Sequence, residues 1–250
     1  MSVALVTGAS TGIGYELARL CAADGHDTVV VANESQIHTA AGDLGARPVQ
    51  ADLATPEGTA AVLEALGGQD VDYLFLNAGT GLGHAFLDQD PDKIEHIVLT
   101  NIMGVLRLVH PLGRRMVARG PGRILITGSI VGFMPGAYQA VYAGTKAFLN
   151  SFSVALAEEL KDTGVTVTCL MPGATETQFF ARADMLDTPV GQAKKDDPAD
   201  VAKTGYEAMM KGTAQATHGL KNKAQATAAE LLPGELVAKL SSRMSRPEDE

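Results

Sequence analysis

The sequence predicts an α/β fold, in which one domain over residues 1–250 forms a doubly wound parallel sheet with helices on both faces. Strand-like and helix-like segments alternate along the chain. The strand-like segments are nearly continuous in their hydrophobicity, as strands covered on both faces are. Glycine-rich and polar motifs follow directly after several of them. Such alternation implies right-handed crossovers between parallel strands, so we expect ligands at the carboxyl ends of the strands.

The predicted strands are short and rich in β-branched or aromatic residues, and they cover Val3–Thr7, Thr28–Ala32, Pro48–Ala51, Tyr73–Asn77, Ile124–Thr127 and Val165–Met171. Helical periodicity lies between them, at Tyr15–Ala23, Ile37–Leu44, Pro56–Leu66, Pro91–Arg119 and Val141–Lys161. Residues 175–195 lack strong periodicity, and we expect them to form a lid over the ligand site. The charged end, residues 246–250, is expected to fray.

The composition excludes several classes of partner. The net charge of −9 argues against nucleic acid or an anionic membrane surface, because either would require a basic face. No uncharged apolar run approaches the roughly 20 residues of a membrane span. Cys21 and Cys169 fit reduced core residues of a cytoplasmic protein, and a disulfide is the less favoured alternative. The histidines are scattered without a metal-binding spacing, so no metal site is expected.

A glycine-rich turn, GASTGIG, joins the first predicted strand to the first predicted helix. Gly8, Gly12 and Gly14 allow a tight turn and the close approach of a pyrophosphate to backbone N–H groups at the helix N-terminus, where the macrodipole favours negative charge. The spacing is G-x-x-x-G-x-G rather than G-x-G-x-x-G. A flexible glycine and serine turn is the alternative, but the strand before it and the helix after it favour a nucleotide site.

The motif Tyr-x-x-x-Lys opens the predicted helix after the fifth strand and places Tyr142 and Lys146 on one helix face. An ammonium beside a phenol favours the phenolate, so we expect the tyrosine pKa to fall from about 10 toward the operating pH. Tyr142 is then a candidate general acid and base. Ser129, at the end of the preceding strand, is placed to hydrogen-bond a substrate oxygen. Alone, the motif is weak evidence, because such pairs are frequent on helix surfaces.

Together, these motifs resemble the short-chain dehydrogenase/reductase family in its form of about 250 residues, and the resemblance covers nearly the whole chain. It rests on motifs in the family's order and spacing, namely Thr7-Gly8-x-x-x-Gly12-x-Gly14, Asp52, Asn77-Ala78-Gly79, the tetrad Asn101, Ser129, Tyr142 and Lys146, and Pro172-Gly173 followed by Thr175 and Thr177. The resemblance implies a Rossmann-like fold and hydride transfer between a nicotinamide cofactor and a carbonyl or secondary alcohol, with Tyr142 handling the proton. It also implies that Asn101 holds a water that connects to Lys146.

The resemblance and the glycine turn place a set of residues at the cofactor, namely Thr7, Gly8, Ser10, Thr11, Gly12, Ile13, Gly14, Asn33, Glu34, Asp52, Leu53, Asn77, Ala78, Gly79, Tyr142, Lys146, Pro172, Gly173, Thr175 and Thr177. Asp52 would accept a hydrogen bond from the adenine amino group, and an ordinary acid at a helix N-terminus is the alternative.

Cofactor choice is where the chain departs from the family's clearer patterns. Members that prefer NAD usually carry an acid where this chain has Ala32, and members that prefer NADP often carry an arginine where it has Asn33 or Thr11. Glu34, twenty residues after Gly14, is the only nearby charge expected. A carboxylate there repels a 2′-phosphate and tolerates a diol, so NAD(H) is favoured over NADP(H).

The residues expected to face a small-molecule substrate are mostly apolar, and they are His84, Ile130, Phe133, Met134, Met171, Phe179, Phe180 and Met185. Such a cleft suits a hydrophobic ketone or alcohol. Two alternatives to an oxidoreductase remain, a cofactor-retaining epimerase or dehydratase and a non-catalytic nucleotide-binding regulatory protein of the same fold. Intact Ser129, Tyr142 and Lys146 count against the second.

Family members commonly form tetramers through the helices that correspond here to Pro91–Arg119 and Val141–Lys161. Both helices carry apolar residues on more than one face, including Val105, Leu108, Val109, Leu149, Phe152 and Val154. We therefore expect a homo-oligomer, either a dimer or a tetramer.

Overall fold

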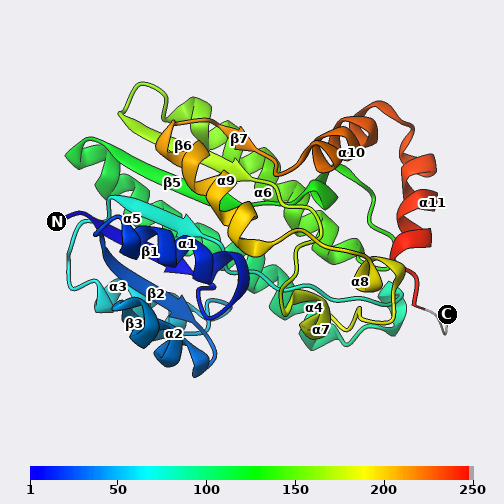
Figure 1. Cartoon of the computed structure of the whole chain (residues 1–250), viewed down its shortest axis with the longest axis horizontal. Helices are drawn as coiled ribbons and strands as arrows, with labels where there is room; N and C mark the ends of the chain where they lie inside the picture. Colours follow the sequence, from blue (N-terminus) through cyan, green and yellow to red (C-terminus); the bar gives the residue numbers. More distant parts are fainter. Residues whose placement is uncertain (248–250) are drawn as a thin grey trace.

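The sheet consists of seven parallel strands in the order β3-β2-β1-β4-β5-β6-β7 in the computed structural model, which describes residues 1–247 (Figure 1). The strands are β1 (Val3–Thr7), β2 (Asp27–Ala32), β3 (Arg47–Gln50), β4 (Tyr73–Leu76), β5 (Gly122–Thr127), β6 (Val165–Leu170) and β7 (Gln215–Ala216). The predicted doubly wound sheet is confirmed, and the predicted strands agree closely with β1 to β6. Strand β7 is missing from the prediction because it is too short to show a hydrophobic pattern.

The helices follow the strands in the order that the sequence predicts as far as residue 161. They are α1 (Gly12–Ala23), α2 (Gln36–Leu44), α3 (Pro56–Ala65), α4 (Pro91–Val98), α5 (Val105–Arg119), α6 (Ala140–Glu159), α7 (Phe179–Arg182), α8 (Pro189–Gln192), α9 (Pro198–Met210), α10 (Leu220–Leu231) and α11 (Gly234–Ser245). Helices α7 and α8 lie in the expected lid. Helices α9, α10 and α11 were not predicted.

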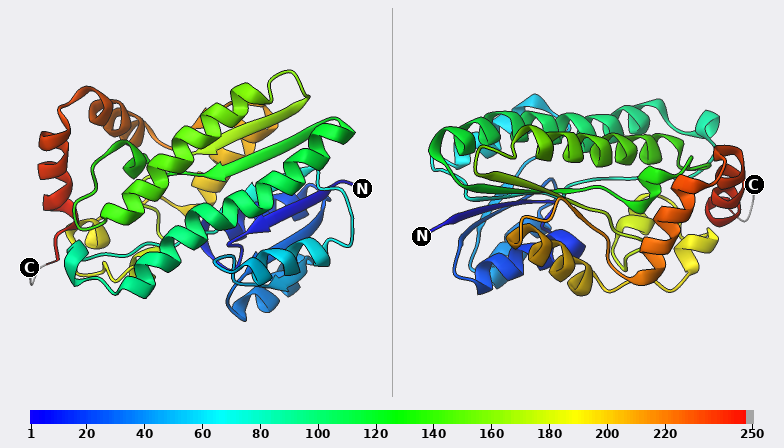
Figure 2. Two further views of the ribbon diagram at one scale, coloured as in Figure 1. Left: turned by 180° about the vertical axis from the view of Figure 1, so that it is seen from behind. Right: turned by 90° about the horizontal axis from the view of Figure 1, so that it is seen from above.

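The sheet lies between two layers of helices, as the view from above shows (Figure 2). Helices α3, α5 and α6 cover one face, where Leu5 of β1 shares a core with Leu108 and Leu149. Helices α1, α2 and α9 cover the other face, where Val6 of the same strand shares a core with Leu17. Neighbouring residues of one strand therefore point into opposite cores. This arrangement explains why the strands are apolar at consecutive positions.

The predicted helix Pro91–Arg119 is divided by a π-helical turn. Helix α4 passes into the π-helix Leu99–Gly104, which passes into α5. Asn101 lies in this turn and is fully buried. A π-helical turn inserts an extra residue into the helix and is frequent at functional sites. The side-chain hydrogen bonds of Asn101 are described below with the cleft.

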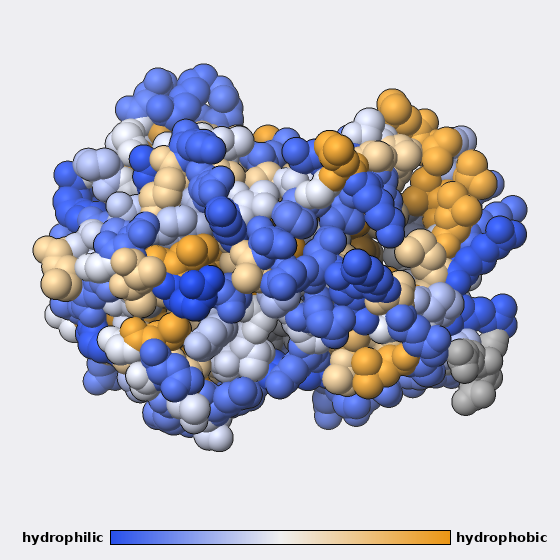
Figure 3. Space-filling model, viewed as in Figure 1, coloured by the Kyte–Doolittle hydropathy of each residue, from blue (hydrophilic) through white to orange (hydrophobic). Residues whose placement is uncertain are grey.

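The C-terminal helices α10 and α11 stand beside the carboxyl ends of the strands, at the opposite end of the molecule from residue 1 (Figure 1). These helices and the turn between them carry large exposed apolar side chains, namely Leu220, Leu231, Leu232, Leu236, Leu240 and Met244. These helices form part of the apolar surface at the right of Figure 3. Helix α11 ends at Ser245, before the segment 246–250 that was expected to fray, and residues 248–250 of that segment lie outside the described residues.

Most of the apolar residues on α5 and α6 that were expected to form an association surface are buried against the sheet. Val105, Leu108, Val109 and Leu149 are all buried in the core of one chain, so they do not supply an uncovered surface. The large apolar residues that are exposed on α4, α5 and α6 are Val98, Val117, Phe148 and Val154.

Several expected absences concern the described part of the chain. No helix within residues 1–247 combines the length and apolar character that crossing a membrane requires. Cys21 and Cys169 are buried free thiols, as expected. The described residues contain no cluster of three or more histidine, cysteine, aspartate or glutamate side chains that could hold a metal ion.

Candidate active site

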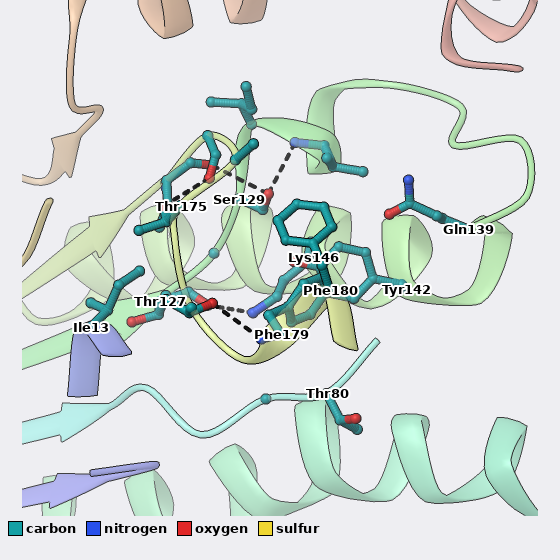
Figure 4. Close-up of a pocket in the computed structure, with 18 of the residues that line it drawn as sticks. Ile13, Thr80, Thr127, Ser129, Gln139, Tyr142, Lys146, Thr175, Phe179 and Phe180 are labelled. Atoms are coloured by element: carbon teal, nitrogen blue, oxygen red, sulfur yellow. Dashed lines mark hydrogen bonds between the residues drawn. The ribbon is translucent and has the colours of Figure 1, made fainter. Parts of the chain in front are cut away.

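A cleft of about 810 Å³ runs along the carboxyl ends of the strands. The order of the strands reverses between β1 and β4, and such a switch point is where open α/β sheets bind ligands. The segments after β1, β2, β3, β4, β5 and β6 line the cleft, and the lid, α10 and α11 complete its walls. Figure 4 shows the residues around Ser129, Tyr142 and Lys146 that form its centre.

Most of the residues predicted at the cofactor line this cleft, and they are Gly8, Ser10, Thr11, Gly12, Ile13, Asn33, Glu34, Asp52, Leu53, Asn77, Ala78, Gly79, Tyr142, Lys146, Pro172, Gly173, Thr175 and Thr177. Ala32, at the end of β2, lines it as well. The residues after five different strand ends therefore meet in one space, as the parallel sheet requires.

The glycine turn is shaped for a close approach of a ligand to its backbone. Gly8 and Gly12 have φ angles of 66° and 61°, which side-chain-bearing residues adopt rarely. A Cβ atom at Gly12 would lie 2.8 Å from Thr177 Cγ2 at the start of the lid. Helix α1 begins at Gly12 without a side-chain cap and without an acid in its first turn. Its first N–H groups and positive dipole end thus suit an anionic group such as a pyrophosphate.

Two residues of the cofactor motif lie behind the cleft and support it. The Thr7 hydroxyl accepts hydrogen bonds from the N–H groups of Asn77 and Ala78, at 3.0 and 3.1 Å, and thereby joins the ends of β1 and β4. A Cβ atom at Gly14 would lie 2.1 Å from Gly8 O, so only glycine allows α1 to pack against its own turn. Thr7 and Gly14 therefore shape the site without lining it.

The end of the cleft that is expected to hold the ribose carries a second charged side chain in addition to Glu34. Glu34 follows β2, and its carboxylate accepts a hydrogen bond of 2.8 Å from Ser10 Oγ. Its other oxygen lies 2.8 Å from a guanidinium nitrogen of Arg182, at the end of α7. The expectation that Glu34 is the only nearby charge is wrong, because the lid folds back and brings in an arginine that is distant in sequence. On the adjacent loop, Asp52 uses one oxygen to accept a hydrogen bond of 2.9 Å from the N–H of Ala54.

Ser129, Tyr142 and Lys146 come together at the centre of the cleft (Figure 4). Lys146 Nζ lies 5.8 Å from the centroid of the Tyr142 ring and donates a hydrogen bond of 2.8 Å to Thr127 O. The backbone N–H of Ser129 donates to Asn150 Oδ1, and Asn150 Nδ2 donates back to Ser129 O at 2.9 Å. Strand β5 and helix α6 thus fix the serine on both sides. The predicted meeting of serine, tyrosine and lysine is confirmed.

Burial dominates the protonation of the two titratable groups in this centre. Burial raises the pKa of Tyr142 to about 12, against a smaller lowering by its hydrogen bond with Ser129. Burial lowers the pKa of Lys146 to about 8. The expectation that Lys146 lowers the tyrosine pKa is wrong for this structure, because loss of hydration outweighs the other influences on the phenol. At neutral pH Tyr142 is therefore a phenol.

Asn101 lies behind the cleft and holds the loop after β4. Its Oδ1 accepts a hydrogen bond of 2.9 Å from the N–H of Thr80, and its Nδ2 donates to Thr80 O and to Thr145 Oγ1 at 2.9 and 3.0 Å. A Cβ atom at Gly79 would lie 3.3 Å from Asn101 Oδ1 and 3.4 Å from Lys146 Nζ. The glycine thus keeps space between the asparagine and the lysine. Asn101 does not line the cleft itself, so the structure places it as a positioning residue.

The expected substrate residues divide into two groups. Ile130, Met134, Phe179 and Phe180 line the cleft, and the rings of Tyr142 and Phe179 lie 5.0 Å apart. His84, Phe133, Met171 and Met185 were also expected there, but they do not line it. Phe133 and Met171 pack in a small core under α10, and Met185 packs beneath the lid.

His84 has a role at the edge of the lid. Its φ angle is 72°, and its Nε2 lies 3.3 Å from Asp184 Oδ2, whose residue also has a positive φ of 55°. Nearby, the N–H of Gly83 donates a hydrogen bond of 2.7 Å to Ala183 O. These contacts join the loop after β4 to the lid. The expectation of a substrate contact at His84 is therefore replaced by a contact between loop and lid.

Several lining residues were not predicted. His96 and Gln139 line the cleft, as do Arg182 of the lid and a group from α10 and α11 that comprises Lys221, Asn222, Gln225, Ala228, Ala229, Val237, Leu240, Ser241, Arg243, Met244 and Ser245. Gln139 Nε2 donates a hydrogen bond of 2.6 Å to Ser245 Oγ and so connects α11 to the start of α6. No local motif distinguishes these residues, since they reach the cleft through tertiary packing alone.

Comparison with known proteins agrees with this geometry. A family model described as short chain dehydrogenase matches residues 2–185. The 3-oxoacyl-[acyl-carrier-protein] reductase FabG of Escherichia coli (strain K12) is 36% identical over 182 residues, which cover 71% of this chain and 75% of that protein.

Solved structures support the same assignment over nearly the full length. A short-chain dehydrogenase from Sphingobium yanoikuyae in complex with NADPH has a TM-score of 0.83 at 29% identity and covers 98% of this chain and 97% of that chain. The 3-ketoacyl-(acyl-carrier-protein) reductase from Brucella melitensis complexed with NADH has a TM-score of 0.75 at 28% identity, with coverage of 87% and 96%. The matched region of the family model holds the glycine turn, Ser129, Tyr142 and Lys146. The chain therefore belongs to the short-chain dehydrogenase/reductase family of oxidoreductases.

Proposed function

We propose that the protein moves hydride between a nicotinamide cofactor and a carbonyl or secondary alcohol carbon that bears an apolar substituent, with Tyr142 as the general acid and base. One observation carries this proposal. The buried group of Ser129, Tyr142 and Lys146 opens into the same cleft as the glycine turn, so a dinucleotide on the turn and a substrate at the tyrosine would share one enclosed space. When bound, the cofactor supplies or accepts the hydride.

Ser129, Tyr142 and Lys146 have different roles in the proposed reaction. Ser129 shares a hydrogen bond with Tyr142 and is placed to hold the substrate oxygen beside the phenol. Because Tyr142 is protonated at neutral pH, it begins as the group that donates a proton to a carbonyl oxygen, which is the requirement for reduction. Lys146, fixed on Thr127 O, places a cation beside the ring and stabilises the phenolate that remains after the transfer.

The walls of the cleft favour a substrate with an apolar body. Ile130 and Phe179 border the catalytic centre, and Val237, Leu240 and Met244 extend the apolar lining along α11. Arg243 and Lys221 also line the cleft, so an acidic end on such a substrate would find a cation. A ketone with a hydrocarbon chain or ring system fits this lining better than a phosphorylated sugar does.

The NAD(H) preference, the cytoplasmic location and the homo-oligomer belong to the same proposal. Glu34 supports the first, and the free thiols of Cys21 and Cys169 support the second. Phe148 and Val154, exposed on α6, support association through that helix. Light scattering at micromolar concentration tests the oligomer, and a monomer mass would contradict it.

The decisive test of the activity is a panel of ketones and alcohols incubated with NADH, NADPH and their oxidised forms. We expect stoichiometric oxidation of reduced cofactor with an apolar ketone. Reduction should be faster below pH 8 than above it, because Lys146, whose pKa is about 8, loses the positive charge that stabilises the phenolate. An isomerised or dehydrated product without net cofactor turnover would instead support the epimerase or dehydratase alternative.

A further inference from the structure

Arg182 and Glu34 form an ion pair between the lid and the loop after β2. The pair measures 2.8 Å between Nη1 and Oε1, and Ser10 Oγ donates to Oε2 of the same carboxylate at 2.8 Å. The other terminal nitrogen of Arg182 donates a hydrogen bond of 2.6 Å to Gln178 Oε1, one turn earlier on the lid. Both oxygens of Glu34 are thus occupied, and the guanidinium is held over the carboxylate. Ser10, Glu34, Gln178 and Arg182 all line the cleft.

The ion pair lies where the ribose of a dinucleotide cofactor is expected to bind. In a Rossmann-type unit, the acid about 20 residues after the glycine turn meets the ribose 2′ position of the cofactor. An unpaired carboxylate there accepts a diol and repels a 2′-phosphate. Arg182 offsets that repulsion, because it places a positive charge within ion-pair distance of the same carboxylate.

A guanidinium also has the right geometry to bind phosphate directly. It presents several N–H donors in a planar fork, more than the contacts with Glu34 and Gln178 require. The side chains of Arg182 and Glu34 are 43% and 34% exposed, so water screens the pair and its net stabilisation is modest. A doubly charged phosphate can therefore compete with the carboxylate for the same arginine.

We propose that Arg182 is a specificity-determining residue for the cofactor, which neutralises Glu34 and serves as the partner of a 2′-phosphate, so that the cleft accepts both NAD(H) and NADP(H). This inference rests on the proposed function, since it requires a nicotinamide dinucleotide in the cleft. In this arrangement Glu34 favours the diol, Arg182 favours the phosphate, and the balance between the two side chains sets the preference.

Removing the positive charge of Arg182 or the negative charge of Glu34 should change cofactor preference in opposite directions. Both effects can be measured by cofactor binding alone, without a substrate. Isothermal titration calorimetry gives the Kd of NADPH and of NADH for each variant. Arg182→Gln should weaken NADPH binding about tenfold and change NADH binding less than about threefold. Glu34→Gln should tighten NADPH binding about tenfold, because Arg182 is released from its carboxylate partner. In the double variant the gain from Glu34→Gln should be lost, because the phosphate partner is gone.

Two controls separate phosphate binding from other effects. Arg19→Gln removes an arginine from an exposed ion pair with Glu16, outside the cleft, and should leave the ratio of the two Kd values unchanged. Arg182→Lys keeps the charge but not the planar fork, and should fall between the parent and Arg182→Gln.

The outcomes distinguish the inference from the proposed function. If Arg182→Gln weakens NADH and NADPH equally, the arginine only holds the lid, and the specificity role is overturned. The same conclusion follows if neither Kd changes. If the parent protein binds no nicotinamide dinucleotide at all, the proposed function itself is wrong, and the inference falls with it.

Discussion

The two walls of the cleft are built in different ways. The wall that carries Ser129, Tyr142 and Lys146 is buried, and hydrogen bonds to Thr127 and Asn150 fix it on β5 and α6. The opposite wall, from α10 and α11, includes exposed apolar side chains such as Leu240 and Met244, and a hydrogen bond from Gln139 to Ser245 connects it to α6. Chemistry requires reacting groups at fixed positions, whereas selection of an apolar substrate requires only a surface of the right extent. Substitutions in the first wall should therefore change turnover or stability strongly, and substitutions in the second should change apparent affinity mildly.

The largest effect is expected at Tyr142. Tyr142→Phe keeps the ring beside Phe179 and removes only the hydroxyl, so turnover should fall by about 10² or more while dinucleotide binding stays nearly unchanged. Steady-state kinetics with one ketone and calorimetric titration of the cofactor measure the two quantities. Turnover close to that of the parent would remove Tyr142 from the proton transfer.

The π-helical turn should be the most sensitive point for stability. Asn101→Ala leaves the part-buried N–H and carbonyl groups of Thr80 and the buried hydroxyl of Thr145 without this partner, and we expect a loss of about 2 kcal/mol or more in the free energy of unfolding. Urea denaturation measures it. Thr100→Ala, in the same turn but only half-buried, is the matched control and should stay within about 0.5 kcal/mol. Equal losses in both variants would contradict the special position of Asn101.

Lys146 should make the stability of the protein depend on pH. Its pKa is about 8 when folded, against an ordinary lysine value of 10.5, so between these values the unfolded chain binds more protons than the folded chain. The free energy of unfolding should therefore rise with pH across this window, and the contribution of Lys146 between pH 7.5 and 9.5 is about 2 kcal/mol. Lys146→Met should lack this rise relative to the parent. Parallel pH profiles of the two proteins would show that the lysine is not desolvated.

The C-terminal wall should respond least. Leu240→Ser removes apolar surface from the cleft at a side chain that is 45% exposed, so KM for a long-chain ketone should rise roughly fivefold with kcat nearly constant. Leu220→Ser, at a leucine that is 85% exposed and does not line the cleft, is the matched control and should leave KM unchanged. A large fall in kcat for Leu240→Ser would mean that α11 takes part in positioning and that the two walls are not distinct.

The features of the fold and of the catalytic wall that the sequence predicts are those that depend on local patterns. The strands, the glycine turn and the Tyr142 motif depend on local spacing, because periodicity and φ requirements act over a few residues. The meeting of Ser129 with Tyr142 and Lys146 follows from the parallel sheet, which brings successive strand ends to one edge. These features were predicted from the residues and agree with the structure.

Other features depend on contacts that no local pattern encodes. Arg182 reaches Glu34 because the lid folds back across the cleft. The residues next to Arg182 in the sequence give no indication of this ion pair. The raised pKa of Tyr142 follows from burial, which spacing along a helix does not measure. His84 follows a motif that borders the cleft, yet its positive φ and its contact with Asp184 turn it toward the lid.

The two edges of the sheet are protected from further strand pairing by different means. At one edge, β3 carries Arg47 and an exposed Pro48, and a proline offers no N–H for pairing. At the other edge, residues 214–216 accept hydrogen bonds from the N–H groups of Cys169 and Met171 and cover β6. Strand β6 itself is an uncharged run, VTVTCL. A chain that ended after α9 would leave this run open, and we expect such a truncation to aggregate through strand addition even though it would still contain Ser129, Tyr142 and Lys146.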